Sequence, residues 1–76
     1  MDANKSVCEI IAKITKKELT GITPELKLAE DLKMKSVSRI ELAALLEDTL
    51  GVIIDNFEIR RPKTVDEVIL LVKSKQ

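Results

Sequence analysis

The sequence predicts an all-α fold: a small bundle of three main helices with a short extra helical turn and a long first loop. Three segments place aliphatic residues at the spacing of an amphipathic helix. The one β-branched run, residues 52–54, has no second strand near it, so we predict a connector and no sheet. The 76 residues make one domain, residues 1–76, near the lower size limit for unaided folding.

Apolar contacts alone must hold this domain together. Cys8 is the only cysteine, so no internal disulfide can form, and no Cys or His spacing suggests a zinc site. Phe57 is the only aromatic residue. We therefore expect an aliphatic core.

The first helix is predicted from about Asn4 to Lys17, and Gly21 ends any continuation. Its apolar residues are spaced i, i+3, i+4 and i+7: Val7, Ile10, Ile11 and Ile14. Ser6 and Glu9 have the spacing of a capping box, so a start at Ser6 is the alternative.

The first loop, residues 18 to 35, is longer than most connections in compact domains. Thr23 can act as a helix cap, and Pro24 would then occupy the first helical position, where proline is favoured. This pair predicts a single helical turn. Four apolar residues can hold the loop against the core: Ile22, Leu26, Leu28 and Leu32. We therefore expect an ordered loop.

The second helix is predicted from Ser36 to Leu50 and is apolar on two sides. One stripe should face the core: Leu42, Leu45, Leu46, Thr49 and Leu50. Other residues lie largely around the rest of the helix: Val37, Ile40, Glu41, Ala44, Glu47 and Asp48. Val37 and Ile40 fit either a wide buried stripe or the apolar centre of a docking face with acidic edges. The pattern favours the two interpretations equally.

The last third of the chain predicts one short turn and one helix. Gly51 ends the second helix, and Asn56 can cap a turn through residues 57–59 that Pro62 ends. Thr64 and Glu67 form a capping box for the final helix. Its inward residues are Val65, Val68, Ile69 and Val72, and Lys73 and Lys75 complement its dipole.

Composition excludes several classes of function. No apolar run approaches the roughly 18 residues of a membrane span, and no signal-peptide core is present, so we expect a cytoplasmic protein. Thirteen basic residues balance thirteen acidic ones, and the helix after Arg39 is acidic, which disfavours a nucleic-acid binder. With no histidine to activate Cys8, we expect no enzyme.

One stretch, residues 29–42, resembles the acyl carrier protein family. The residues in register with its motif are Asp31, Leu32, Ser36, Ile40, Glu41 and Leu42. The similarity continues through Gly51, the pair Ile54-Asp55 and the pair Thr64-Val65, so it covers nearly the whole chain.

The resemblance implies a phosphopantetheine arm attached to Ser36 through a phosphodiester, with a terminal thiol that carries acyl groups as thioesters. The implied partners are a phosphopantetheinyl transferase and the ligases, synthases or acyltransferases of fatty-acid, polyketide or lipid-modifying pathways. The expected partner-binding residues are Val37, Ile40, Glu41, Ala44, Glu47, Asp48 and Ile54. The family also shelters acyl chains between helices; Leu46, Ile54 and Ile59 can line such a space, although core packing explains them equally well. We expect a monomer.

Two serines compete as the attachment site. Ser36 can instead be a helix cap, since serine is favoured there for its hydrogen bonding. Ser38 and Glu41 have capping-box spacing, so Ser38 can cap the helix and leave Ser36 in the approach loop. We prefer Ser36 for the arm because only Ser36 keeps the family register on both sides.

The sequence departs from the family around this serine. Lys35 and Ser38 replace acidic residues, Val37 replaces leucine, and with Lys33 and Arg39 the surroundings become basic. The following surface stays acidic through Glu41, Glu47, Asp48, Asp55 and Glu58. Pro62 replaces an apolar helix-end residue and should shorten the helix before it. These departures indicate a specialised carrier. The alternative is a carrier fold without the arm, acting as an interaction module through Val37, Ile40, Ala44 and the acidic edge.

Overall fold

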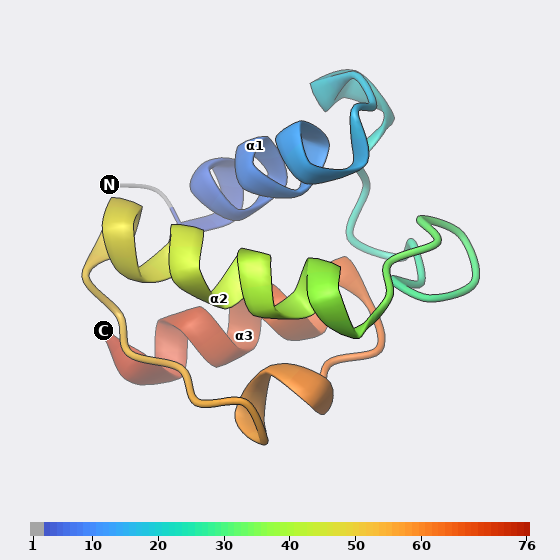
Figure 1. Ribbon diagram of the computed structural model, residues 1–76. Helices are drawn as coiled ribbons and strands as arrows, with labels where there is room; N and C mark the ends of the chain where they lie inside the picture. The colour runs from blue at the N-terminus through green and yellow to red at the C-terminus, as the bar shows by residue number, and fades with distance from the viewer. Residues whose placement is uncertain (1–2) are drawn as a thin grey trace.

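Three α-helices and two short 3-10 turns form the described chain, residues 3–76, in the computed structural model. They are α1 Ala3–Thr15, η1 Leu19–Gly21, α2 Ser36–Leu50, η2 Glu58–Arg60 and α3 Val65–Lys75. In Figure 1, α2 crosses the front of the bundle, α1 lies above it, α3 behind and below it, and η2 beneath its first half. The predicted all-helical fold is confirmed, and the second helix has the predicted bounds.

The core is aliphatic and is shared by all three helices and the loops. Its largest fully buried side chains are Val7, Ile11, Leu28, Leu42, Leu46, Ile59, Val65, Val68 and Val72. The four inward positions predicted for α3 are all buried. Thr49 was expected in the core stripe of α2 but is exposed, because it lines an open cleft with Glu9 and Lys13 of α1. Ala43 is buried on the core side of α2.

The ends of α1 differ from the sequence prediction. The helix stops at Thr15, because Lys16 adopts a left-handed conformation (φ 59°) and the Lys17 N–H donates to the Ala12 carbonyl at 3.0 Å. At the other end, α1 begins before Ser6, which is buried inside the helix and cannot cap it. The helical continuation does end at Gly21, as predicted, since Gly21 is the last residue of η1.

The first loop is ordered, as predicted, and its anchors are both apolar and polar. Ile22, Leu28 and Leu32 are buried, and Leu26 packs against the same core. Three backbone hydrogen bonds join this loop to the start of α3: Leu28 N to Lys63 O (2.9 Å), Val65 N to Leu26 O (3.0 Å) and Asp66 N to Pro24 O (2.9 Å). The loop therefore fixes the segment that leads into α2.

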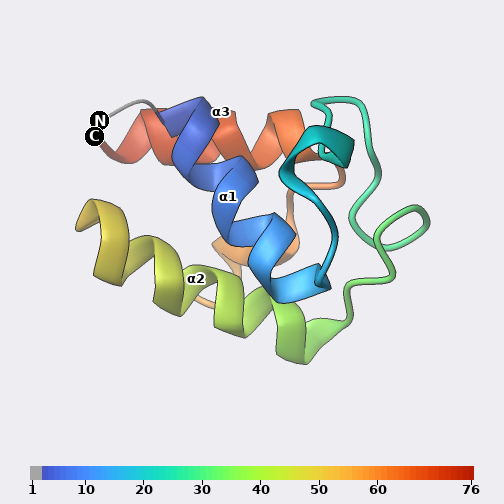
Figure 2. The ribbon, with the colours of Figure 1, turned by 90° about the horizontal axis from the view of Figure 1, so that it is seen from above.

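Two predicted helix ends are confirmed. Thr64 Oγ1 accepts the Glu67 N–H at 3.2 Å and so caps α3, while Glu67 Oε1 accepts the N–H of Lys63, one residue before the cap, at 3.1 Å. Gly51 takes the left-handed conformation (φ 70°), and its N–H donates to the Glu47 carbonyl at 2.9 Å. Viewed from above, the start of α1 and the end of α3 lie at the end of the bundle opposite the start of α2 (Figure 2).

Candidate functional site

Ser36 is the first residue of α2 and is exposed to solvent. Lys35 occupies the N-cap with an extended backbone and no side-chain hydrogen bond, and its carbonyl accepts the Arg39 N–H at 3.0 Å. Neither serine therefore caps the helix, and the expected Ser38–Glu41 capping box does not form because α2 starts before Ser38. The Ser36 hydroxyl has no hydrogen-bond partner among residues 3–76.

The approach to Ser36 alternates between buried and exposed side chains. Leu32 and Met34 are buried, and the Met34 N–H donates to the Leu28 carbonyl at 2.8 Å. Lys33, whose backbone is left-handed (φ 58°), and Lys35 are exposed between and after these anchors. The buried anchors thus place two ammonium groups in the short segment just before the serine.

This arrangement fits a phosphodiester on the serine oxygen. The first N–H groups of a helix lack intrahelical acceptors, and the positive end of the helix dipole favours an anion. The first turn of α2 contains no acidic residue that would oppose a phosphate. Lys33 and Lys35 add positive charge on the approach side. Ser36, the start of α2 and the two lysines therefore suit a phosphate-linked group.

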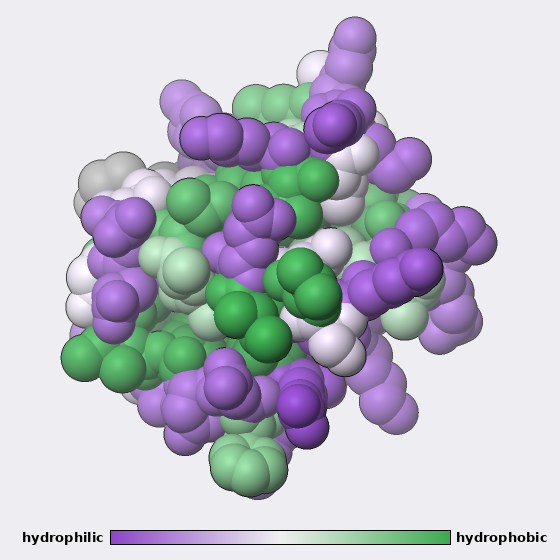
Figure 3. Space-filling view, in the orientation of Figure 1, coloured by the Kyte–Doolittle hydropathy of each residue, from purple (hydrophilic) through white to green (hydrophobic). Residues whose placement is uncertain are grey.

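The outer side of α2 is exposed, so Val37 and Ile40 do not belong to a wide buried stripe. Val37 is 76% exposed and Ile40 is 49% exposed. Four further predicted partner-binding residues are exposed along the same helix: Glu41, Ala44, Glu47 and Asp48. Figure 3 shows apolar surface over the middle of α2 with hydrophilic surface around it. We call these six residues the outer face of α2.

Ile54 corrects one sequence prediction. It was expected on the partner-binding surface, but it is only 8% exposed and belongs to the core. Its neighbour Ile53 is 73% exposed, because successive side chains of an extended connector point to opposite sides. Ile53 is therefore the surface residue of this connector.

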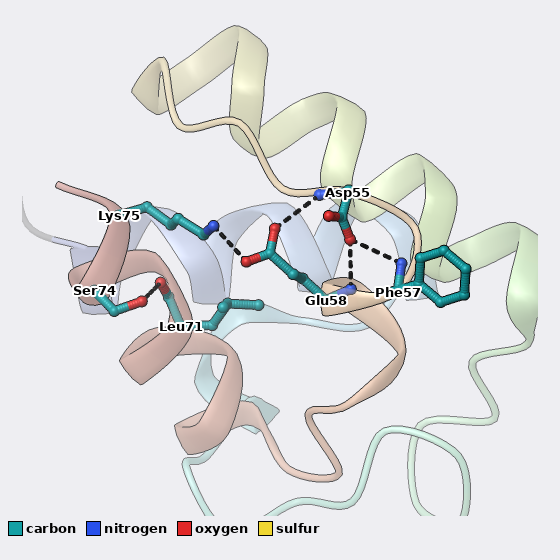
Figure 4. Close-up of polar contacts among 6 residues, drawn as sticks. All are labelled: Asp55, Phe57, Glu58, Leu71, Ser74 and Lys75. Atoms are coloured by element: carbon teal, nitrogen blue, oxygen red, sulfur yellow. Dashed lines mark hydrogen bonds and ion pairs between the residues drawn. The ribbon is translucent and has the colours of Figure 1, made fainter.

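A network of polar contacts orders the turn that leads into η2 and joins it to the end of α3. Asp55, rather than the predicted Asn56, caps the turn that leads into η2: its Oδ1 accepts the Phe57 N–H (2.9 Å) and the Glu58 N–H (2.8 Å). Glu58 Oε1 accepts the Asp55 N–H at 3.2 Å, so this cap is reciprocal and lies one residue earlier than the predicted cap at Asn56. Glu58 also forms an ion pair with Lys75 at the end of α3. Figure 4 shows the Phe57 ring pointing away from this network, and the ring is 76% exposed.

The Glu58 network predicts a pH-dependent contribution to stability. The hydrogen bond from Lys75 and the Asp55 N–H lower the pKa of Glu58 below its ordinary value of 4.5. A lowered folded-state pKa stabilises the fold above the ordinary value and loses that contribution as pH falls through the folded-state pKa. Glu58→Gln should therefore melt below wild type at neutral pH, and the difference should shrink as the pH falls below 4.5.

Melting curves by circular dichroism at a series of pH values measure this difference. Glu30→Gln is the control, since Glu30 pairs with Lys27 in an exposed contact that should contribute little. A difference between Glu58→Gln and wild type that stays constant with pH would contradict the prediction.

The hydrogen bonds of the Arg39 side chain were not predicted from the sequence. Arg39 was counted among the basic groups around Ser36, but its Nη1 donates to the Ile59 carbonyl at 2.9 Å and the Pro62 carbonyl at 2.7 Å. The side chain is half-buried, and this burial lowers the pKa of the guanidinium. The partners lie far along the chain from Arg39, so no local pattern could reveal them.

Comparison with known proteins identifies a family with a site of this kind. The sequence profile of the family described as "Phosphopantetheine attachment site" matches residues 5–69. The chain is 33% identical over 72 residues to the acyl carrier protein of Rickettsia canadensis, which covers 95% of this chain and 84% of that protein. The chain belongs to the acyl carrier protein family. The predicted resemblance is thereby confirmed, and the cofactor of this family is a covalent phosphopantetheine group.

A second group of relatives is longer than this chain. The chain is 34% identical over 67 residues to the meromycolate extension acyl carrier proteins of Mycobacterium tuberculosis and Mycobacterium leprae. The match covers 88% of this chain but 58% of those proteins. No helix in residues 3–76 is long and apolar enough to cross a membrane. The same residues contain no cluster of His, Cys, Asp or Glu suited to a metal.

Proposed function

We propose that this protein is an acyl carrier whose phosphopantetheine arm is attached to Ser36. The observation that supports the proposal is the exposed, unpartnered Ser36 hydroxyl at the start of α2, within the matched family region. When attached, the group supplies a thiol on which acyl chains travel as thioesters. The chain itself contributes the serine oxygen, the helix terminus and the lysines beside the phosphate, and a surface for partner enzymes.

The outer face of α2 is the proposed partner-binding surface. Val37 and Ile40 provide exposed apolar area, and the helix continues into a run with Glu41, Glu47 and Asp48 and no basic residue. Interfaces commonly combine an apolar centre with a polar rim. The partners would be a phosphopantetheinyl transferase and the ligases, synthases or acyltransferases that load and unload the carrier. We propose that the carrier acts as a cytoplasmic monomer and catalyses no reaction itself.

The proposed function is tested by arm installation on the purified chain. Treatment with a broad-specificity phosphopantetheinyl transferase and coenzyme A should raise the intact mass by one phosphopantetheinyl group. A chain that stays unmodified while a standard carrier is converted in the same tube would refute the proposal.

Lys35 should make this carrier a poor substrate for transferases that act on acidic carriers. Lys35→Asp should raise kcat/KM for such an enzyme at low salt, since it removes charge repulsion beside Ser36. The gain should shrink with added salt, because exposed charges are screened over about 8–10 Å near physiological ionic strength. The measurement is the initial rate of arm installation across a salt series.

Lys5→Asp is the matched control for the Lys35 experiment. Lys5 is also exposed, but it lies in the first turn of α1, at the end of the bundle opposite Ser36 (Figures 1 and 2). An equal gain for both variants would show an effect of net charge alone. No gain for Lys35→Asp at low salt would remove Lys35 from partner selection.

A further inference from the structure

The seam between α2 and η2 begins close to the proposed attachment site. α2 packs directly against η2, and the interior beneath them contains Leu42, Leu46 and Ile59, all nearly inaccessible to solvent. η2 lies beneath the half of α2 that starts at Ser36 (Figure 1). A group attached to Ser36 therefore stands at the outer end of a seam that leads to apolar interior.

Arg39 crosses this seam one helical turn after Ser36. Its Nη1 donates to the Ile59 and Pro62 carbonyls at 2.9 and 2.7 Å, and we call this pair of bonds the Arg39 latch. Within residues 3–76 they are the only side-chain hydrogen bonds between α2 and the segment of residues 55–63. Both bonds have a charged donor, which makes each stronger than a neutral hydrogen bond.

We infer that Arg39 determines cargo specificity by setting the shortest acyl chain that the bundle can shelter. The inference rests on the proposed function, since it requires a chain carried on Ser36. Burial of an apolar chain is favourable because the chain leaves water. Each buried methylene raises the equilibrium constant for entry into the bundle roughly fourfold. To reach the interior along the seam the chain must part η2 from α2 and break the latch, which leaves a half-buried guanidinium and two carbonyls unpaired.

The balance between these two effects gives the expected size of the change. Breaking each hydrogen bond of the guanidinium lowers the equilibrium constant for chain entry about tenfold. The two bonds of the latch together therefore lower it about a hundredfold. Three to four methylenes offset a factor of that size. Short chains should therefore stay in solvent in the wild type, and removal of the latch should move the onset of shelter to chains about three methylenes shorter.

Arg39→Met removes the donors and keeps a long apolar stem. Arg60→Met is the matched control, because Arg60 is an exposed arginine of η2 whose side chain makes no hydrogen bond or ion pair among the described residues. Arg39→Lys retains a charged donor and should give an intermediate onset. It also keeps the inference testable if Arg39→Met folds poorly by circular dichroism.

The experiment loads the full chain from acyl-coenzyme A donors whose chains lengthen by two carbons at a time. The readouts are the rate at which hydroxylamine releases the acyl group and the melting temperature of each loaded form. At chain lengths just below the wild-type onset, release from Arg39→Met should be at least tenfold slower than release from wild type and Arg60→Met. The same onset in all variants, or no protection at any length, would overturn the latch. A wild-type chain that accepts no arm would instead refute the proposed function, and this inference with it.

Discussion

Ser36→Ala should abolish arm installation completely, and Ser38→Ala should leave it largely intact. Ser36 is exposed at the first position of α2, where its hydroxyl has no partner in the described chain and the helix terminus favours a phosphate. Ser38 lies two residues further into the helix and is half-buried. Ser36→Ala should therefore lose arm installation because the attachment oxygen is missing, and the fold should be unaffected.

The two serine variants control for each other. Both replace a hydroxyl in the first turn of α2, and neither hydroxyl caps the helix, so both proteins should melt close to wild type. Intact mass after transferase treatment is the readout, with circular dichroism to confirm the fold. Persistent labelling of Ser36→Ala together with loss in Ser38→Ala would show that the arm belongs on Ser38.

Leu46→Ala should lower the free energy of unfolding by about 2–5 kcal/mol. Leu46 is completely inaccessible to solvent, and truncation would leave a cavity at the centre of the bundle. Small domains are stable by only about 5–15 kcal/mol, so this loss is a large share of the total. The Leu46→Ala protein should therefore melt at a much lower temperature than wild type.

Ile40→Ala is the comparison that separates core from docking face. Ile40 is aliphatic and on the same helix, but about half of it is exposed. Its truncation should cost far less stability and should instead slow transfer to and from partner enzymes. Thermal melts by far-ultraviolet circular dichroism measure the stability difference, since the chain has no Trp. Comparable losses in both variants would place Ile40 in the core and reduce the docking face to its other residues.

The sequence predicted the parts of the fold that depend on local patterns. The spacing of Val65, Val68, Ile69 and Val72, the Thr64–Glu67 capping box and the Gly51 stop each rest on residues a few positions apart. Where two local signals competed, the outcome depended on geometry beyond the pattern. Asp55 and Asn56 are both good caps, and the reciprocal hydrogen bond that the Asp55 N–H donates to Glu58 Oε1 favours Asp55.

The candidate site divides in the same way. Ser36 and the composition of the α2 face followed from motif register and helical periodicity, and the exposure of Val37 and Ile40 is tertiary information that the structure supplied. The choice between Ile53 and Ile54 depends on how the connector leaves Gly51, which no periodic pattern encodes over three residues. Arg39 meets carbonyls that only the fold brings next to it.

The most direct test of the carrier proposal is the mass of the protein isolated from its own host. Intact and fragment masses should show one phosphopantetheinyl group on Ser36, with part of the population bearing an acyl group on the arm. That acyl group would also identify the pathway. A fully unmodified chain from cells whose other carriers are modified would contradict the account and leave a carrier fold that works as an interaction module without the arm.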